Sequence, residues 1–243
     1  LTTVFMLLFG VNFNCYYWLL LRNFRSVLKN EELRLYLGSF AVATALITVN
    51  TLRFFSSVGE GIRHAAFQVA SIMTTTGFAT TDFNLWPAFS KALILALMIM
   101  GACAGSTGGG FKCVRVLLLF KNLKRSIKKL LHPQSVETVR IDGEPVRESI
   151  VEGTGTYLIA YVFIAIASFL IISIDGFSVE TNLSATISCL NNIGPGFDVV
   201  GPMGSFAGYG VVSKLVLTLD MLAGRLEIFP ILVLFSKRTW KVN

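Results

Sequence analysis

Charged residues are scarce in this sequence. Asp, Glu, Lys and Arg make up 14% of its 243 residues, whereas soluble domains carry about 25%. Hydrophobic residues make up 53% of the chain, and its mean hydropathy is +0.67. This combination excludes a soluble domain, a disordered chain and a coiled coil. It indicates a membrane protein.

Cysteine and histidine are equally sparse. The four cysteines form no Cys-x-x-Cys pair, and the two histidines, His64 and His132, are isolated. We therefore expect the cysteines to be reduced packing residues and not disulfides or metal ligands. Because no catalytic Ser/His, paired Asp or zinc-ligand set falls at membrane depth, the sequence does not predict an enzyme or a bound cofactor. The cysteines are Cys15, Cys103, Cys113 and Cys189.

Five long apolar segments match the length of about 20 residues that a membrane-spanning helix needs. The first starts at Leu1 and lacks the basic region of a signal peptide, so we expect the chain to begin within a helix of a longer protein. The third is interrupted by glycines. The five predicted spans cover residues 1–21, 35–55, 88–120, 157–174 and 210–235.

Two shorter apolar segments, residues 62–73 and 179–190, are too short to cross a membrane. Each leads into a polar segment that contains glycine, around Gly77 and Gly194. Bare backbone at membrane depth is tolerated only where it is buried in protein or lines water. We therefore interpret each as a re-entrant pore helix followed by a pore loop.

The order span, short helix, glycine loop, span occurs twice, with an offset of 194 − 77 = 117 residues. The fold class is therefore an all-α membrane protein built from tandem parallel repeats, unlike the inverted repeats of many transporters. Because about four such units surround a pore, a chain with two and a fraction needs a partner half. The predicted division is a last span of an earlier repeat (1–22), a third-type repeat (34–120), a cytoplasmic basic linker (121–152), a fourth-type repeat (153–236) and a cytoplasmic tail (237–243).

Basic residues exceed acidic ones by 21 to 14. If both short segments re-enter from one face of the membrane, most of the basic residues lie on the opposite face. We expect that opposite face to be cytoplasmic. Residues 112–131 hold seven basic residues and no acidic one, which fits a membrane-surface helix, a partner-docking face or a solvated loop. Nucleic acid is a poor alternative, because topology already accounts for the charge.

Four motifs carry a resemblance to a known family: residues 67–78, 101–112, 192–196 and 224–230. Together they resemble the membrane subunit of Trk-type potassium uptake systems, in the Trk/Ktr/HKT superfamily. The resemblance implies four tandem units in one polypeptide, of which this chain is the end of the second and the complete third and fourth. It also implies a homodimer in the bacterial inner membrane, with a cytoplasmic C-terminus, docked to a nucleotide-binding regulatory ring through residues 112–129 and through Lys237, Arg238 and Lys241.

The two glycine loops are candidates for an ion filter, since K+ exchanges its water for closely spaced backbone carbonyls. The alternative is an ordinary turn after a short helix. By resemblance, the filter favours K+ over Na+, less strictly than a fully symmetrical filter. The candidate filter residues are Thr75, Thr76, Gly77 and Phe78 with Asn192, Ile193, Gly194 and Pro195, and K+ is expected at the first three of each set.

A third glycine-rich segment interrupts the third predicted span. Because glycine costs about 1 kcal/mol in a helix relative to alanine, four glycines among six residues are expected to unwind the span. A helix-packing face is the alternative. By resemblance, the segment is an intramembrane gate. It comprises Gly105, Ser106, Thr107, Gly108, Gly109 and Gly110.

Arg225 lies in an apolar segment, where a charge is costly. Subtracting the repeat offset, 225 − 117 = 108, places it level with Gly108. We therefore predict that Arg225 is a latch on the gate or a barrier to cations. The alternative is a buried ion pair with Asp220 or Glu227.

The sequence thus predicts potassium uptake through a channel-like pore that a cytoplasmic subunit regulates. The alternative is a cation-coupled secondary transporter, a K+ or Na+ symporter. A saturating flux that needs no coupled gradient separates the first from the second.

Overall fold

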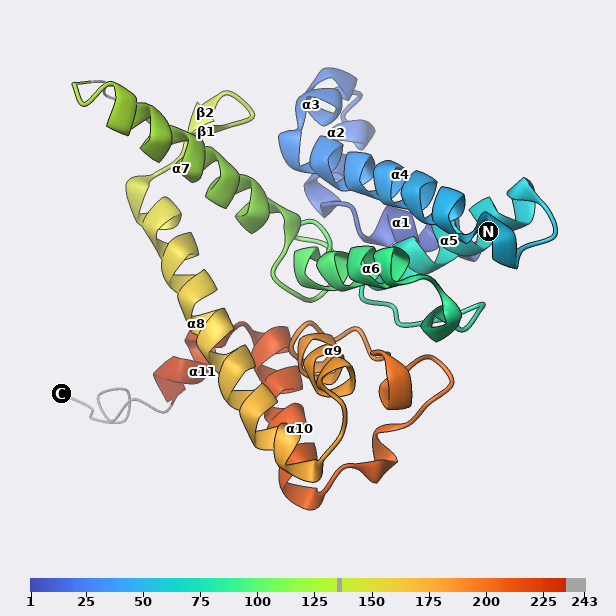
Figure 1. Ribbon diagram of the computed structural model, residues 1–243. Coiled ribbons are helices and arrows are strands. Elements are labelled where there is room, and N and C mark those ends of the chain that lie inside the picture. Colours follow the sequence, from blue (N-terminus) through green and yellow to red (C-terminus); the bar gives the residue numbers. More distant parts are fainter. Residues whose placement is uncertain (135–136, 235–243) are drawn as a thin grey trace.

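The computed structural model describes residues 1–134 and 137–234, and its described part is almost wholly helical (Figure 1). The predicted helical fold is confirmed, with one small exception. A hairpin pairs strand β1 (Arg140–Ile141) antiparallel with β2 (Glu144–Pro145). The α-helices are α1 (Thr2–Phe9), α2 (Phe13–Leu20), α3 (Phe24–Lys29), α4 (Glu31–Thr51), α5 (Val58–Met73), α6 (Ala88–Met100), α7 (Cys113–Leu131), α8 (Glu148–Ile172), α9 (Val179–Leu190), α10 (Val211–Leu226) and α11 (Ile228–Leu234).

Side-chain caps start three helices that define the repeat. Asn30 accepts a hydrogen bond from the Leu33 N–H at the start of α4, at 2.7 Å. Ser57 accepts one from the Glu60 N–H of α5, and Ser178 accepts one from the Thr181 N–H of α9. Because a cap satisfies an amide that the helix leaves unpaired, these short polar residues fix where each helix begins.

Two helical segments are long and apolar enough to span a membrane, Glu31–Phe54 and Glu148–Asp175. They confirm the predicted spans at residues 35–55 and 157–174. Large exposed side chains such as Phe163 and Leu170 cover the second of these, as expected for a surface that faces lipid.

The other predicted spans are broken. Residues 1–21 form two helices, α1 and α2, which are bent by 94°. The segment 210–235 ends its first helix at Leu226, because Glu227 adopts a φ of 67°. The predictions of continuous spans at these two places are therefore wrong. In the third predicted span the expected interruption is present, and it extends over residues 101–112 between α6 and α7.

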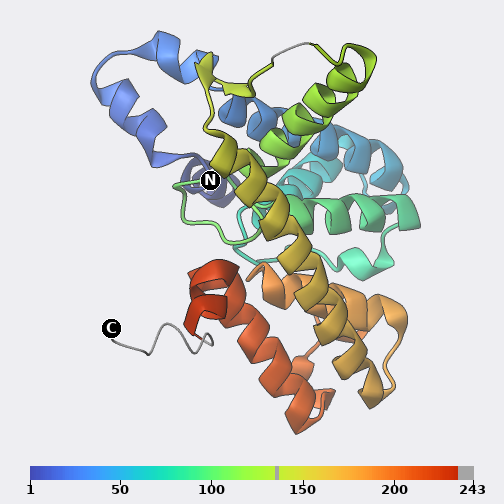
Figure 2. The ribbon, with the colours of Figure 1, turned by 90° about the vertical axis from the view of Figure 1, so that its left-hand side faces the viewer.

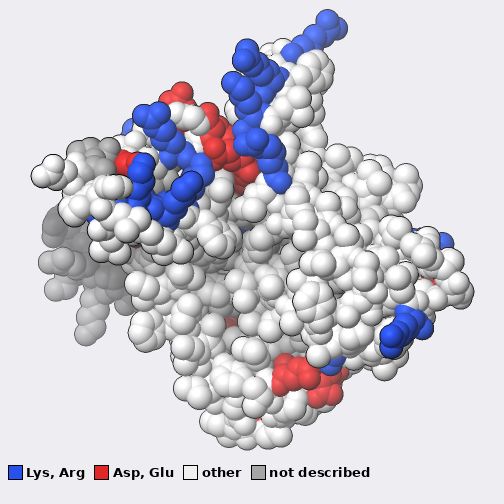
Figure 3. All heavy atoms as spheres, turned by 45° about the horizontal axis from the view of Figure 1, so that its top comes forward, with Lys and Arg blue, Asp and Glu red and all other residues white. Residues whose placement is uncertain are grey.

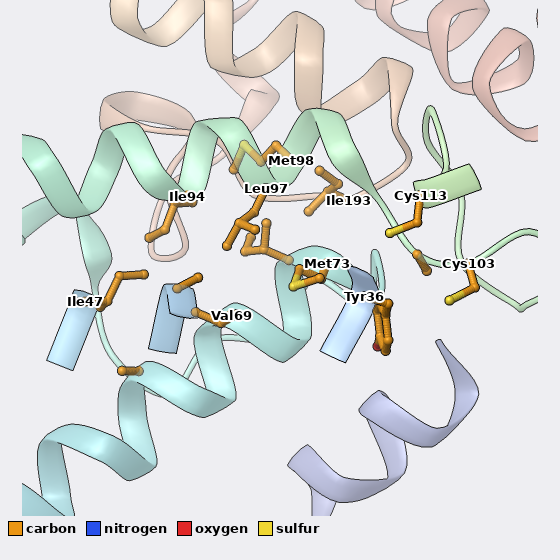
Figure 4. Packing of buried hydrophobic residues seen from close by; sticks show 14 of the residues in the cluster. Tyr36, Ile47, Val69, Met73, Ile94, Leu97, Met98, Cys103, Cys113 and Ile193 are labelled. Carbon is orange, nitrogen blue, oxygen red and sulfur yellow. The ribbon is translucent and has the colours of Figure 1, made fainter. Parts of the chain in front are cut away.

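The helices form two groups that meet at the glycine loops (Figures 1 and 2). In the first group α4 packs against α5 and α6, and in the second α8 and α10 pack around α9. Figure 4 shows the core of the first group, with Ile193 of the second repeat inserted beside Met98. Residues of both repeats therefore share one hydrophobic core at the level of the loops.

All four cysteines are buried and free, so the expectation that they are packing residues is confirmed. Cys103 and Cys113 lie close together where residues 101–112 leave and rejoin helices (Figure 4). The Cys113 N–H donates to the Ala102 carbonyl at 2.9 Å. The interruption is thus a loop whose two ends lie side by side.

Lys and Arg gather at the end of the molecule that includes α7 (Figure 3). Three basic side chains of α7 are held by carboxylates: Lys121 by Glu31, Arg125 by Glu148 and Lys128 by Glu137. The predicted basic segment is therefore a helix that is ion-paired to its surroundings. Lys237, Arg238, Lys241 and the predicted tail at 237–243 lie outside the described residues.

Candidate functional site

The two glycine loops share one backbone conformation. Thr75 and Asn192, which are 192 − 75 = 117 residues apart, have φ angles of 54° and 57°. Gly77 and Gly194, separated by the same offset, also have positive φ, at 79° and 111°. Non-glycine residues rarely adopt such angles. Two such residues at equivalent positions show that these loops have the same local structure.

The hydrogen bonds that shape the loops also recur at this offset. The Thr76 N–H donates to the Ser71 carbonyl at 2.9 Å, and the Ile193 N–H donates to the Ser188 carbonyl at 2.9 Å. The serine hydroxyls have different partners: that of Ser71 donates to the Phe78 carbonyl at 2.6 Å, and that of Ser188 accepts from the Gly194 N–H. Each loop is therefore held back onto the helix that precedes it.

The loops lie against each other. A Cβ atom added to Gly77 would lie 2.2 Å from the Ile193 carbonyl oxygen, whereas one added to Gly194 would meet nothing within 4 Å. Glycine at position 77 thus allows the close approach of the second loop. Glycine at position 194 has open space on the side where a Cβ atom would lie.

Phe83 and Phe197 continue this contact just beyond the loops, with ring centroids 5.5 Å apart. The Asp198 N–H donates to Asn84 Oδ1 at 2.8 Å, and Asn84 Nδ2 donates to the Asp198 carbonyl. These pairs join the segments that follow the two filter candidates. They were not predicted from the sequence, since neither asparagine nor aspartate at these positions belongs to a motif.

Asp198 also ties its loop to the start of α9. Its Oδ2 accepts hydrogen bonds from the hydroxyls of Thr181, at 2.7 Å, and Ser178, at 3.0 Å. These hydrogen bonds hold the pKa of Asp198 below its ordinary value of 3.8, and the bond from Thr181 has the larger effect. The ionised carboxylate is therefore the form that the folded protein favours.

Acid should loosen this tie. A depressed pKa contributes stability that is present above the ordinary value and is lost as the pH falls through the folded-state pKa. We expect Asp198→Asn in the complete protein to lower the thermal unfolding midpoint at pH 7 and to flatten its decline below pH 4. Thr181→Val, which removes one donor, should move that decline to higher pH. Identical acid profiles for wild type and both variants, measured in detergent, would show that the contact is energetically neutral.

The loop of residues 101–112 contacts several distant parts of the chain. On one side it meets the break between α1 and α2: the Cys103 N–H donates to the Gly10 carbonyl at 3.1 Å, and the Phe13 N–H donates to the Gly105 carbonyl at 3.1 Å. The loop also contacts the first filter candidate, because the Gly109 N–H donates to Thr75 Oγ1 at 2.9 Å. The loop therefore touches a predicted filter residue directly.

Arg225 lies at the far side of the same loop. Its guanidinium donates to the Thr107 carbonyl at 3.2 Å. The two carboxylates that were its alternative partners are bound elsewhere: Asp220 accepts from Ser168, and Glu227 pairs with Arg115 at 2.6 Å. The alternative of an ion pair with either carboxylate is thus not what the structure shows.

A cavity of about 200 Å³ separates the loop from the end of α10. Glu227 lies at the edge of the cavity, where it pairs with Lys112 at 3.6 Å and with Arg115. Arg115 in turn lies over the ring of Tyr157, 3.9 Å from its centroid, an arrangement that favours a cation. The cavity is lined by Ser106, Thr107, Gly108, Gly109, Gly110, Lys112, Gly224, Arg225 and Glu227.

Several residues around this loop escaped the sequence analysis. They include Glu32, whose buried carboxylate accepts from the Ala104 and Val114 amides, and the ion pairs of Glu227. Each joins residues more than 70 positions apart, so periodicity and local motifs carry no sign of it. For Glu227 the signal available was its place in an apolar segment, where a carboxylate needs a cation.

These features define a class. Apolar spanning helices, broken helices and two like glycine loops at the junction of repeats form the architecture of a helical membrane transport protein.

A family model described as TrkH, cation transport protein, matches residues 1–241. The chain belongs to the TrkH family.

Individual relatives agree with this membership. The Trk system potassium uptake protein TrkH of Salmonella typhimurium is 36% identical over 244 residues, covering 98% of this chain and 50% of the relative. TrkG of Escherichia coli K12 is 29% identical over 242 residues, covering 98% of this chain and 49% of the relative. The crystal structure of the potassium transporter TrkH from Vibrio parahaemolyticus superposes with a TM-score of 0.88 at 32% identity, covering 99% of this chain and 52% of that one. The chain therefore spans about half the length of these relatives.

Proposed function

We propose that this chain supplies half of the wall of a potassium uptake pore in the bacterial inner membrane, with its C-terminus in the cytoplasm. Thr75, Thr76 and Gly77 in one loop, and Asn192, Ile193 and Gly194 in the other, offer backbone carbonyls to K+. Phe78 and Pro195 complete the two filter segments. The Phe78 carbonyl already accepts the Ser71 hydroxyl, so it is the weakest ion ligand of the set.

The observation that carries this proposal is the likeness of the two loops. They share positive φ angles at equivalent residues, and the Ile193 carbonyl approaches Gly77 too closely for any side chain there. Extended or left-handed backbone with free carbonyls can replace the hydration shell of K+. Two such loops side by side form half of a fourfold ring, and the other half of the longer protein would close it.

The loop of residues 101–112 acts as the gate. It is bound to Thr75 on the filter side and to Arg225 on the other, so it lies across the space between the filter and the end of α10. Arg225 holds the loop through the Thr107 carbonyl, and its positive charge opposes the passage of a cation. The gate opens when this loop leaves both partners.

Regulation enters from the basic end of the molecule. Helix α7 begins where the gate loop ends, and it carries some of the Lys and Arg side chains that gather at this end of the molecule (Figure 3). A cytoplasmic nucleotide-binding subunit that docks on α7 is therefore mechanically next to the gate. The complete protein assembles as a homodimer in the lipid bilayer, and it uses K+ as cargo.

A coupled transporter is the second candidate, and one residue favours it. Asp220 is buried in α10, and its Oδ2 has no hydrogen-bond partner in the described part of the chain. A buried carboxylate of this kind is a familiar proton or cation site in transporters. Asp220 is hydrogen-bonded to Ser168 and does not belong to the filter loops. A substitution at Asp220 can therefore test whether K+ transport is coupled to another ion.

Potassium flux into liposomes that hold the complete protein separates the two candidates. We expect a saturating flux along a K+ gradient that persists when proton and sodium gradients are collapsed, in wild type and in Asp220→Asn alike. Loss of flux on collapse of either gradient, or in Asp220→Asn alone, would favour the coupled transporter.

A further inference from the structure

Glu32 is a buried carboxylate that the mechanism above leaves unused. It lies in the first turn of α4, and its side chain is 4% exposed. Its Oε1 accepts hydrogen bonds from the Ala104 N–H at 2.6 Å and from the Val114 N–H at 3.0 Å. A buried charge is costly unless it is hydrogen-bonded. These two bonds offset part of the cost of burying the carboxylate.

The two donors lie at opposite ends of the gate loop. Ala104 belongs to the segment that leaves α6, and Val114 is the second residue of α7. The N-cap of α7, Lys112, provides no side-chain hydrogen bond, so Glu32 satisfies one of the amides that this helix leaves open. A negative charge at a helix N-terminus is favourable. One side chain thus fixes the base of the loop and the first turn of the next helix.

We propose that Glu32 is a positioning residue that sets the closed conformation of the gate loop. The inference rests on the proposed function, in which this loop is the gate. With both bonds in place, the base of the loop cannot move without α7. A displacement of α7 pulls the Val114 amide away from the same oxygen that holds Ala104, so the base loosens at both ends together.

Cys103 provides a readout of the loop that does not depend on transport. Its side chain is wholly buried at the base of the loop, so a thiol reagent can reach it only when the loop moves. The measurement uses the complete protein with every other cysteine replaced by alanine. Each variant is assayed for the rate of Cys103 modification, for K+ flux without the regulatory subunit and for K+ over Na+ selectivity.

Three variants grade the effect. Glu32→Ala removes the one oxygen that accepts both hydrogen bonds, and since hydrogen bonds to charged groups are strong, modification and unregulated flux should each rise about tenfold. Glu32→Gln keeps an oxygen but loses the charge, so rises of about threefold are expected. Glu60→Gln is the matched control: this carboxylate lies in the first turn of α5 and accepts from the Ser56 N–H, away from the loop and from α7, and both rates should stay at wild type. Selectivity should be unchanged in all three.

Wild-type modification rates in folded Glu32→Ala and Glu32→Gln would overturn the inference. Where the alanine variant fails to fold, the glutamine variant decides in the same way. Deletion of residues 105–110 tests the proposed function separately. If that deletion leaves the flux unchanged, the loop is not the gate, whereas faster Cys103 modification in Glu32→Ala would still show that Glu32 holds the loop.

Discussion

Replacing Gly194 by serine in the complete protein is expected to lower the selectivity for K+ over Na+ by about tenfold or more, because about 1.4 kcal/mol of altered backbone energy suffices for that. Gly194 has a φ of 111°, which a residue with a Cβ rarely adopts. A Cβ there would meet nothing within 4 Å. The substitution therefore distorts the carbonyls of the loop without a steric clash, and the protein should still fold. The measurement is K+ and Na+ flux per folded transporter.

Two comparisons make this result specific. Gly176→Ser is the control, since Gly176 also has a positive φ, at 78°, and also borders open space, but follows the 3-10 helix Ser173–Asp175 beyond α8. Its selectivity should match wild type. Gly77→Ser should lose selectivity too, and at a larger cost in stability, because its Cβ would collide with the Ile193 carbonyl. Unchanged discrimination in well-folded Gly194→Ser would remove this glycine from the filter.

Replacing Arg225 by alanine should raise K+ flux in the absence of the regulatory subunit by about tenfold, the effect of losing one hydrogen bond to a charged group. The variant loses both the bond to the Thr107 carbonyl and the positive charge beside the loop. Because Asp220 and Glu227 are bound to Ser168 and Arg115, neither should be left unpaired, and the variant should fold.

Arg225→Lys separates the latch from the charge. It keeps the cation and loses the planar guanidinium, so its flux should lie between those of wild type and alanine. Lys214→Ala, in the first turn of the same helix, removes a cation that donates to the Ala207 carbonyl, outside the loop, and should leave flux unchanged. A folded Arg225→Ala with wild-type flux would count against the latch.

Local composition was enough to predict the features that repeat. The offset of 117 residues came from two glycines, and it also placed Arg225 beside the loop of Gly108, where the structure has it. The spans at 35–55 and 157–174 followed from apolar length alone. In each case the signal lay in neighbouring residues or in their repetition.

The breaks were harder to predict because distant contacts stabilise them. Residues 1–21 are mostly apolar, and the chain bends there at the Asn12 cap of α2, where the Cys103 N–H donates to the Gly10 carbonyl and the Phe13 N–H donates to the Gly105 carbonyl. Glu32 resembled an ordinary acidic residue in the first turn of a helix, and its burial depends on a loop more than 70 residues away. Such contacts appear only when the fold brings the segments together.

The central claim is that the two glycine loops bind potassium, and rubidium tests it most directly. Rb+ takes the place of K+ and scatters anomalously, so crystals of the complete protein grown in Rb+ locate the ion. The account predicts an anomalous peak bounded by the carbonyls of Thr75, Thr76 and Gly77 and those of Asn192, Ile193 and Gly194. Well-ordered loops with no peak between them, or a peak only elsewhere in the protein, would contradict it.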